Sequence, residues 1–243
     1  MDEMLKLEHV RGVLIRLEET IIFGLIERAQ FCCNRIIYEA GGVGAELGAG
    51  SLLDFLLHET EKVHARVRRY RSPDEHPFSD ELPEPLLPAL DYDACPLHAS
   101  TVNINRRIRQ VYIEHIVPAV CRPGDDQQYG SSAVNDVILL QALSKRIHYG
   151  KFVAESTYRT ERRAYDELIE SADATGLRRT ITVPAVEEAL FDRVRRKTAT
   201  YSRELAAAGE DTVDPEAVVK IYSDWIIPLS KDVEVAYLLQ RRG

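Results

Sequence analysis

The sequence lacks the features of secreted and membrane-spanning proteins. Its four cysteines form neither a CxxC pair nor a regular framework, which favours a reduced, intracellular protein over a disulfide-rich one. No apolar run reaches the roughly 20 residues that a membrane-spanning helix needs, and the N-terminus MDEMLKLEHV resembles neither a secretory signal nor a transit peptide. We therefore expect a cytoplasmic protein without a membrane partner, and a removed plastid or secretory leader remains compatible with the sequence.

Motifs for several kinds of chemistry are also missing. The net charge of −8 argues against a general nucleic-acid binder, which is usually basic. The glycine-rich stretch Gly41–Gly50 contains no GxGxxG and follows a helical pattern instead of a strand. No HExxH, Cys/His cluster or GxSxG is present. We expect no metal, no cofactor and no nucleic-acid partner, and any anion site must be built locally against the negative overall charge.

Helical periodicity is what the sequence does have. Apolar residues at helical spacing predict a first helix over Glu3–Glu39, ended by the glycine cluster. Six prolines within 73–102 indicate a long ordered loop, not a linker between independent domains. We expect an all-α, single-domain bundle of about ten to twelve helices over residues 1–243. The other expected helices cover 51–71 (with a Ser51–Asp54 capping box), 103 or 105 to 120, 132–158, 161–172, 182–208, and a pair from Asp214-Pro215 that is split at Pro228.

One segment, Gly130–Glu155, is more informative than any other. Its apolar residues leave almost no fully polar face, which is typical of a buried helix. It nevertheless carries Lys145, Arg146, His148 and Lys151 toward its end. Because a buried cation is costly unless an anion pairs with it, the segment suggests a pocket for an anionic small molecule. The alternative is an arginine that reaches the surface or a structural carboxylate.

Five segments in the same order along the chain resemble one family, the all-helical chorismate mutases of fungi and plants. These segments are LEHVRGVLIRLEETIIFGLIERAQF, HARVRRYRSPDEHPF, GSSAV...LQALSKRIHYGKFVAE, VPAVEEALFDRV and DWIIPLSKDVEVAYLLQRR. The resemblance implies an isomerase that converts chorismate to prephenate in phenylalanine and tyrosine biosynthesis, by a Claisen rearrangement without a cofactor. The alternative is a divergent relative, weakly active or non-catalytic, that acts by ligand binding or regulation.

The resemblance also implies an active site. Arg11 and Arg146 match the two arginines that bind the substrate carboxylates, a task that suits the bidentate guanidinium. Glu187 matches the glutamate that binds the substrate hydroxyl. Ser230 takes the place of a carboxylate-binding threonine, and Glu234 matches the glutamate near the ether oxygen. Glu234 can donate a hydrogen bond there only if it is protonated, so its pKa is expected to be raised.

Each of these residues also has a plainer interpretation. Arg11 alone would be a solvated surface residue. Glu187 could simply favour the positive end of a helix from its first turn. Glu234 could form a surface salt bridge with Lys231 or Arg241.

Two substrate-site positions depart from the family. Thr157 stands where the family usually has lysine, eleven residues after Arg146 and on the same helical face. A threonine is too short to replace the lysine's donation to the ether oxygen, unless water or Arg159 substitutes. Val183 stands where fungal members have asparagine, although Val183-Pro184 looks more like plant members.

Fungal and plastid plant members bind tyrosine and tryptophan as effectors at a dimer interface. The resemblance therefore implies a homodimer and an effector site for which arginines and backbone groups of a turn are chemically suited. The matching positions are Arg68, Arg69, Gln127, Gln128, Gly130, Ser131 and Val134.

Overall fold

The computed structural model describes residues 3–44, 50–89, 95–207 and 213–241. Part of the predicted glycine stop at Gly41–Gly50 lies outside these residues. Across the described ranges the regular elements are helical and no strand occurs, apart from an isolated bridge between Cys32 and Arg122. The predicted all-α class is therefore confirmed. No helix in these ranges is long and apolar enough to cross a bilayer.

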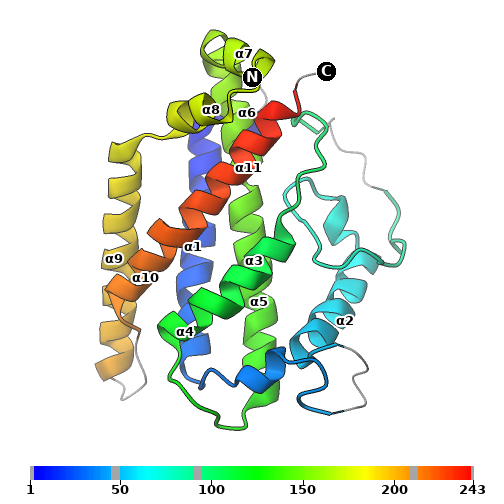
Figure 1. The fold of residues 1–243 in the computed structure, drawn as a ribbon, viewed down its shortest axis with the longest axis vertical. Helices are drawn as coiled ribbons and strands as arrows, with labels where there is room; N and C mark the ends of the chain where they lie inside the picture. The colour runs from blue at the N-terminus through cyan, green and yellow to red at the C-terminus, as the bar shows by residue number, and fades with distance from the viewer. Residues whose placement is uncertain (1–2, 45–49, 90–94, 208–212, 242–243) are drawn as a thin grey trace.

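The α-helices carry the labels of Figure 1. They are α1 Leu7–Ala29, α2 Leu52–Arg66, α3 Asn105–Val111, α4 Val117–Val120, α5 Tyr129–His148, α6 Gly150–Thr160, α7 Arg162–Glu170, α8 Ala174–Ile181, α9 Pro184–Ala207, α10 Pro215–Ile221 and α11 Ile227–Leu239. Short 3₁₀ turns cover Glu3–Leu5, Arg35–Tyr38 and Arg69–Arg71, and π turns cover Tyr112–Ile116 and Tyr222–Ile226.

Several of these segments run on into one another. A π turn joins α3 to α4 and another joins α10 to α11, in each case just before a proline, Pro118 or Pro228. A wider turn accommodates the missing N–H and the bulk of a proline ring. Tyr149, which joins α5 to α6, also has a right-handed helical backbone. Three of the eleven segments therefore continue a preceding one, which leaves eight continuous helices in the described ranges. The predicted count of ten to twelve is too high.

Two predicted helix ends and one missing helix also need correction. The first helix ends at Ala29 instead of Glu39, because the chain extends through Cys32–Asn34 and Asn34 takes a left-handed conformation. The second ends at Arg66 instead of Arg71, since Arg68 is left-handed too. Helix α8 was not predicted, although Asp173 caps it by accepting a hydrogen bond from the Gly176 amide.

Other local signals predicted the structure correctly. The Ser51–Asp54 capping box is present in full at the start of α2. Asp214 caps α10, and Pro215 is its first residue. Both signals act within one turn of the helix, where the chain itself supplies the hydrogen-bond partners.

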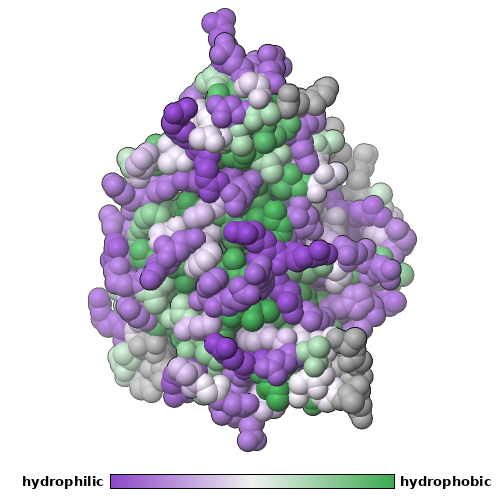
Figure 2. All heavy atoms as spheres, viewed as in Figure 1, coloured by the Kyte–Doolittle hydropathy of each residue, from purple (hydrophilic) through white to green (hydrophobic). Residues whose placement is uncertain are grey.

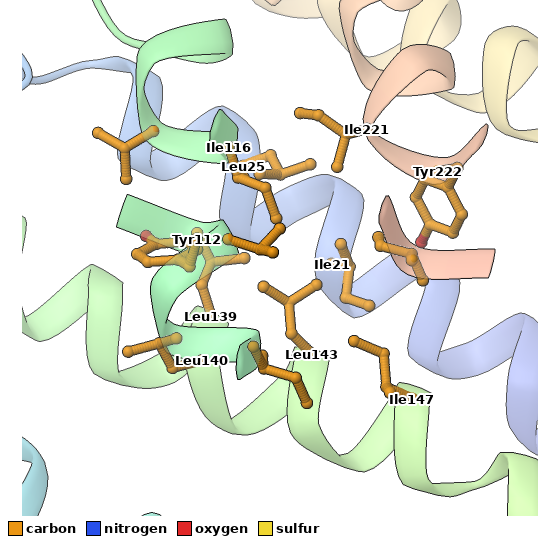
Figure 3. Close-up of a cluster of buried hydrophobic side chains, with 14 of the residues drawn as sticks. Ile21, Leu25, Tyr112, Ile116, Leu139, Leu140, Leu143, Ile147, Ile221 and Tyr222 are labelled. Atoms are coloured by element: carbon orange, nitrogen blue, oxygen red, sulfur yellow. The ribbon is translucent and has the colours of Figure 1, made fainter. Parts of the chain in front are cut away.

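Helix α5 runs through the middle of the bundle. Figure 1 shows α1 and α5 side by side along the long axis, with α11 crossing them, α9 on one flank and α2 on the other. Leucines and isoleucines of α1 and α5 interleave with Tyr112, Ile116, Ile221 and Tyr222 in the main core (Figure 3). The face over α3 and α11 is mostly covered by hydrophilic side chains, with hydrophobic atoms showing between them (Figure 2).

A buried ion pair fastens the end of α1 to α5. Arg28 and Asp136 have fully buried side chains, and the Arg28 Nε donates to Asp136 Oδ1 at 2.6 Å. The hydroxyls of Tyr38 and Tyr112 donate to the same carboxylate at 2.7 and 2.6 Å. The remaining guanidinium nitrogens donate to carbonyls that follow α1, including that of Cys32 at 2.9 Å. The pair thus fixes the point where the chain leaves α1.

Removal of one partner from this pair is expected to be strongly destabilising. In Asp136→Ala, Arg28 keeps a buried charge without its carboxylate, and the free energy of unfolding should fall by about 3–5 kcal/mol. Urea denaturation followed by circular dichroism measures the change. Glu84→Ala is the control, because it breaks an exposed pair with Arg71. Equal losses in the two variants would contradict the anchoring role of the buried pair.

Candidate active site

Arg146 lies in the last turn of α5 and is 5% exposed. Its Nη1 donates to Ser230 Oγ at 3.2 Å, and its buried Nε has no hydrogen-bond partner. Among the residues that the structure describes, no carboxylate forms an ion pair with it. Burial lowers its pKa, yet a guanidinium remains charged at any ordinary pH. The two plainer interpretations of this arginine are therefore wrong, and an unpaired buried cation is left facing α11.

A buried carboxylate that interacts with Arg146 is paired with other cations. Glu18 on α1 is 1% exposed, and Arg193 of α9 binds both of its oxygens at 2.9 Å. Lys197 lies 3.3 Å from the same carboxylate. The sequence contains no signal for this cluster, because its members lie about 175 residues apart. Its effect is to occupy Glu18, so that Arg146 keeps its charge for another anion.

Glu234 faces the same region from α11. Its side chain is buried, and burial raises its pKa to about 8, although the nearby cations Arg146 and Lys231 favour the charged form. The two salt-bridge partners considered for it are engaged elsewhere, since Lys231 binds Glu187 and Arg241 binds Glu155. Glu234 is therefore mostly protonated at pH 7 and can donate a hydrogen bond, as the sequence predicts.

A glycine allows this close approach of helices. A Cβ atom added to Gly150, the first residue of α6, would lie 2.9 Å from the Ser230 carbonyl oxygen and 3.0 Å from Glu234 Cγ. Such contacts are too short for a real side chain. The glycine therefore lets the α5–α6 junction rest directly on α11, which places Arg146 against Ser230.

Glu187 enters from a third element, the first turn of α9. Its carboxylate accepts from the Lys231 ammonium at 2.6 Å, and both side chains are largely buried. Glu187 also raises the pKa of Glu234, which means that the two carboxyls are close enough to interact. The region thus holds a lysine-paired carboxylate, a second carboxyl group with a raised pKa, and a guanidinium whose hydrogen-bond partner in the described ranges is the Ser230 hydroxyl, a combination suited to recognising an anion that also carries a hydroxyl.

The remaining predicted substrate residues are less closely tied to this cluster. Arg11, in α1, is exposed and forms no ion pair within the described ranges. Val183, just before α9, is 51% exposed. The Thr157 hydroxyl donates to the Val153 carbonyl at 2.5 Å, within its own helix. Their convergence with Arg146 on a single ligand stays a prediction.

The predicted effector residues fall into two groups. Arg68 and Arg69 line a cavity of about 710 Å³ beside α2, and Arg69 and Val134 line an adjoining one of about 520 Å³ between α2 and α5. Neither cavity includes a residue of the Arg146 cluster. The other four positions, which line neither cavity, lie at the start of α5: Gln127, Gln128, Gly130 and Ser131.

Arg69 itself is held in place. It donates to Glu75 at 3.0 Å and to the Gln141 side chain on α5 at 3.2 Å. Gly130 precedes Gln141 by eleven residues of α5, which is about 16 Å along a helix axis. Arg69 and Gly130 of one chain therefore lie too far apart to bind the same amino acid.

Comparisons with known proteins all identify the same family. Residues 129–235 match the family model for chorismate mutase type II. A chorismate mutase of Schizosaccharomyces pombe is 47% identical, over 99% of this chain and 98% of its own length. The crystal structure of AtCM1 with tyrosine bound in its allosteric site is 46% identical and superposes with a TM-score of 0.91, over 100% of this chain and 98% of the other. Aro7p chorismate mutase from Candida albicans in complex with L-Trp is 39% identical, with a TM-score of 0.90, over 98% and 92% of the two chains.

The protonation of Glu234 can be measured directly. Carbon-13 NMR of labelled glutamate should show one carboxyl that titrates near pH 8, because burial raises the pKa of Glu234 to about 8. In Arg146→Met this pKa should rise further, since a nearby cation that favours the ionised form is removed. Glu234→Gln is the control and should delete the signal. Titration of every glutamate near the ordinary value of about 4.3 would contradict this description of the site.

Proposed function

The chain belongs to the chorismate mutase type II family, and we propose that it converts chorismate to prephenate at the cluster around Arg146. One observation supports this location above all others. Arg146 is a buried guanidinium whose only hydrogen-bond partner in the described ranges is the Ser230 hydroxyl. A buried cation without an anion is costly, and a substrate carboxylate would supply the missing partner.

The reaction is an intramolecular rearrangement, so the protein acts by positioning and by electrostatic preorganisation. We propose that Arg146, aided by Ser230, binds one substrate carboxylate and that Arg11 binds the other. Ionised Glu187 accepts a hydrogen bond from the substrate hydroxyl. Protonated Glu234 donates to the ether oxygen, where negative charge grows as the C–O bond breaks.

All of these groups belong to one helical body, which we propose is a single domain over residues 1–243. Support comes from the main core, where buried residues of α1, α5, α9 and α10 pack together. The cytoplasmic location expected from the cysteine pattern stays a prediction.

A divergent, weakly active or non-catalytic homologue is the second candidate, and Thr157 is the observation that favours it. This position carries no positive charge, and its hydroxyl is bound within its own helix. A direct assay of chorismate loss with the purified protein separates the two candidates. Turnover supports the enzyme, whereas binding of chorismate without turnover supports the non-catalytic relative.

Substitution of Arg146 tests the proposed site. Arg146→Ala should abolish turnover and leave the circular dichroism spectrum helical, because it removes the bidentate partner of a substrate carboxylate. Arg146→Lys should stay strongly impaired, since an ammonium keeps the charge but loses the planar fork. Arg109→Ala, which breaks a partly exposed pair with Asp54, is the matched control and should keep activity. Wild-type turnover in Arg146→Ala would place the site elsewhere.

We also propose that tyrosine and tryptophan bind between two copies of the chain. AtCM1 holds tyrosine in an allosteric site, and the Candida albicans protein was solved with L-Trp. In this chain Arg69 contacts α5 at Gln141, about three helical turns from Gly130, so a second copy is needed to bring the two residues to one ligand. Exposed apolar side chains beside the cavities favour such a homodimer: Val63, Val67, Val134 and Ile138.

Calorimetry tests the effector site. Tyrosine and tryptophan should bind the wild-type chain and should lose binding in the double variant Arg68→Ala/Arg69→Ala, because the effector carboxylate loses its cations. Arg66→Ala, a neighbour on α2 that lines neither cavity, should bind normally. Binding that survives the double variant would place the effector elsewhere.

A further inference from the structure

Thr157 leaves a place in the site without the cation expected there. It follows Gly150 by seven residues, so the two share one face of α6. That face packs on Ser230 and Glu234 at Gly150. A threonine there contributes only a short, uncharged side chain, and its hydroxyl already donates to Val153. A reaction that develops negative charge therefore needs a positive group from another element.

Most cations on the surrounding helices are committed to other partners. Lys151 on α6 donates to His76 at 2.7 Å and to the Val102 carbonyl at 2.5 Å. Arg159, the substitute considered from the sequence, binds Glu155 at 2.7 Å and the Pro96 carbonyl at 2.5 Å. The idea that Arg159 fills the gap is therefore not supported by its contacts.

Arg178 on α8 is engaged as well. It binds Asp232 at 2.6 Å and is 42% exposed, so water screens its charge. Its field still reaches Glu234, whose ionised form it favours. It contacts neither Glu187 nor Ser230 within the described ranges.

Lys231 is differently placed. It follows Ser230 directly and precedes Glu234 by three residues. Lys231 and Glu234 therefore lie on the same side of α11. Its side chain is 14% exposed, and its Nζ lies 2.6 Å from Glu187. It thus touches one of the proposed substrate-binding carboxyls and lies within electrostatic reach of the other.

We propose that Lys231 is a positioning residue that holds the Glu187 carboxylate in place and supplies beside Glu234 the positive charge that Thr157 cannot. This inference rests on the proposed function. Through the ion pair, Lys231 keeps Glu187 a hydrogen-bond acceptor for the substrate hydroxyl. Its charge also stabilises negative charge that grows near Glu234 in the transition state.

Two effects follow from removal of this cation. Glu187 loses its partner, so substrate binding should weaken and KM should rise. The site also loses positive charge near the developing oxyanion, which should lower kcat. If Lys231 were only structural, a cation introduced at another position could not restore activity. If it acts through its charge, such a cation can restore part of it.

The test uses four variants of the full chain in the chorismate assay. Lys231→Met should lower kcat/KM about tenfold or more, below the roughly 10²–10³ for a donor that touches the substrate. Lys231→Arg should keep most activity because it keeps the charge. Thr157→Lys in the Lys231→Met background should restore part of the loss. Lys220→Met, an exposed lysine eleven residues earlier on the same continuous helix, is the control and should behave as wild type.

The pH dependence of activity provides a second, independent test of the role of Lys231. Glu234 must be protonated to donate, so activity should fall as pH rises through its pKa of about 8. The charged and titratable groups that face it are Arg146 on α5, Glu187 on α9, Arg178 on α8, Tyr165 on α7 and Lys231 on its own helix. Lys231 is one of the cations that favour the ionised form, so Lys231→Met should move the alkaline limb to higher pH, and Lys231→Arg should not.

Each outcome decides the proposal. Lys231→Met with wild-type kcat/KM, or with a loss that neither Lys231→Arg nor Thr157→Lys relieves and with an unshifted limb, would overturn it. Turnover by the wild-type chain is a separate result: it supports the proposed function and says nothing about Lys231. If the wild-type chain shows no turnover, the proposed function fails, and carbon-13 NMR still tests Lys231: the pKa of Glu234 must rise in Lys231→Met, and an unchanged titration would refute the proposal.

Discussion

A charge buried in the middle of the bundle must find a partner, and helix α5 is where this constraint is most severe. The helix is enclosed on most sides, yet it carries Asp136, Ser144, Arg146 and His148 among its buried residues. Asp136 is satisfied by Arg28 and two tyrosines, and Ser144 donates to Asn105 at 2.6 Å. The His148 Nε2 accepts from the Ile104 amide at 3.0 Å. Among these four residues of the described chain, only Arg146 has a buried donor without a hydrogen-bond partner, and this supports the proposed site.

The two glutamates of the site show how environment divides one chemistry into two roles. Glu187 lies in the first turn of α9, and its carboxylate is paired with the Lys231 ammonium. Glu234 has no such partner, and burial raises its pKa to about 8. One group can therefore accept a hydrogen bond while its neighbour donates one at the same pH. The proposed mechanism uses this difference, because the rearrangement needs both an anchored hydroxyl and a stabilised ether oxygen.

Under the role proposed for Lys231, the positive charge of the site belongs to the whole cluster and does not depend on position 157 alone. A cation matters through its distance from the reacting oxygen, and a side chain on α11 can deliver it as well as one on α6. Lys231 reaches Glu187 of α9, and Gly150 allows α6 and α11 to approach closely at Ser230 and Glu234. The departure from the family at one position therefore need not remove the electrostatic contribution from the site.

The sequence alone determined the helical class and several helix starts, and its resemblance to the family nominated the site residues, whose roles stay predictions. The Ser51–Asp54 capping box and Asp214-Pro215 acted within a single turn, and the apolar surface of Gly130–Glu155 marked the central helix. Such signals are local, so the chain near each residue carries all the information that they need. Where helices end or continue was harder to predict, because the left-handed turns at Asn34 and Arg68 and the π turns before two prolines are formed with help from tertiary contacts.

Only the tertiary structure decided which charges remain available. Arg146 is free because Arg193 and Lys197, far along the chain, occupy Glu18. Burial among the packed helices raises the pKa of Glu234 to about 8, and Glu187 is held in place because Lys231 reaches it from another helix. Coulombic and desolvation energies depend on distances in space and on burial, and spacing along the chain fixes neither for residues on different helices.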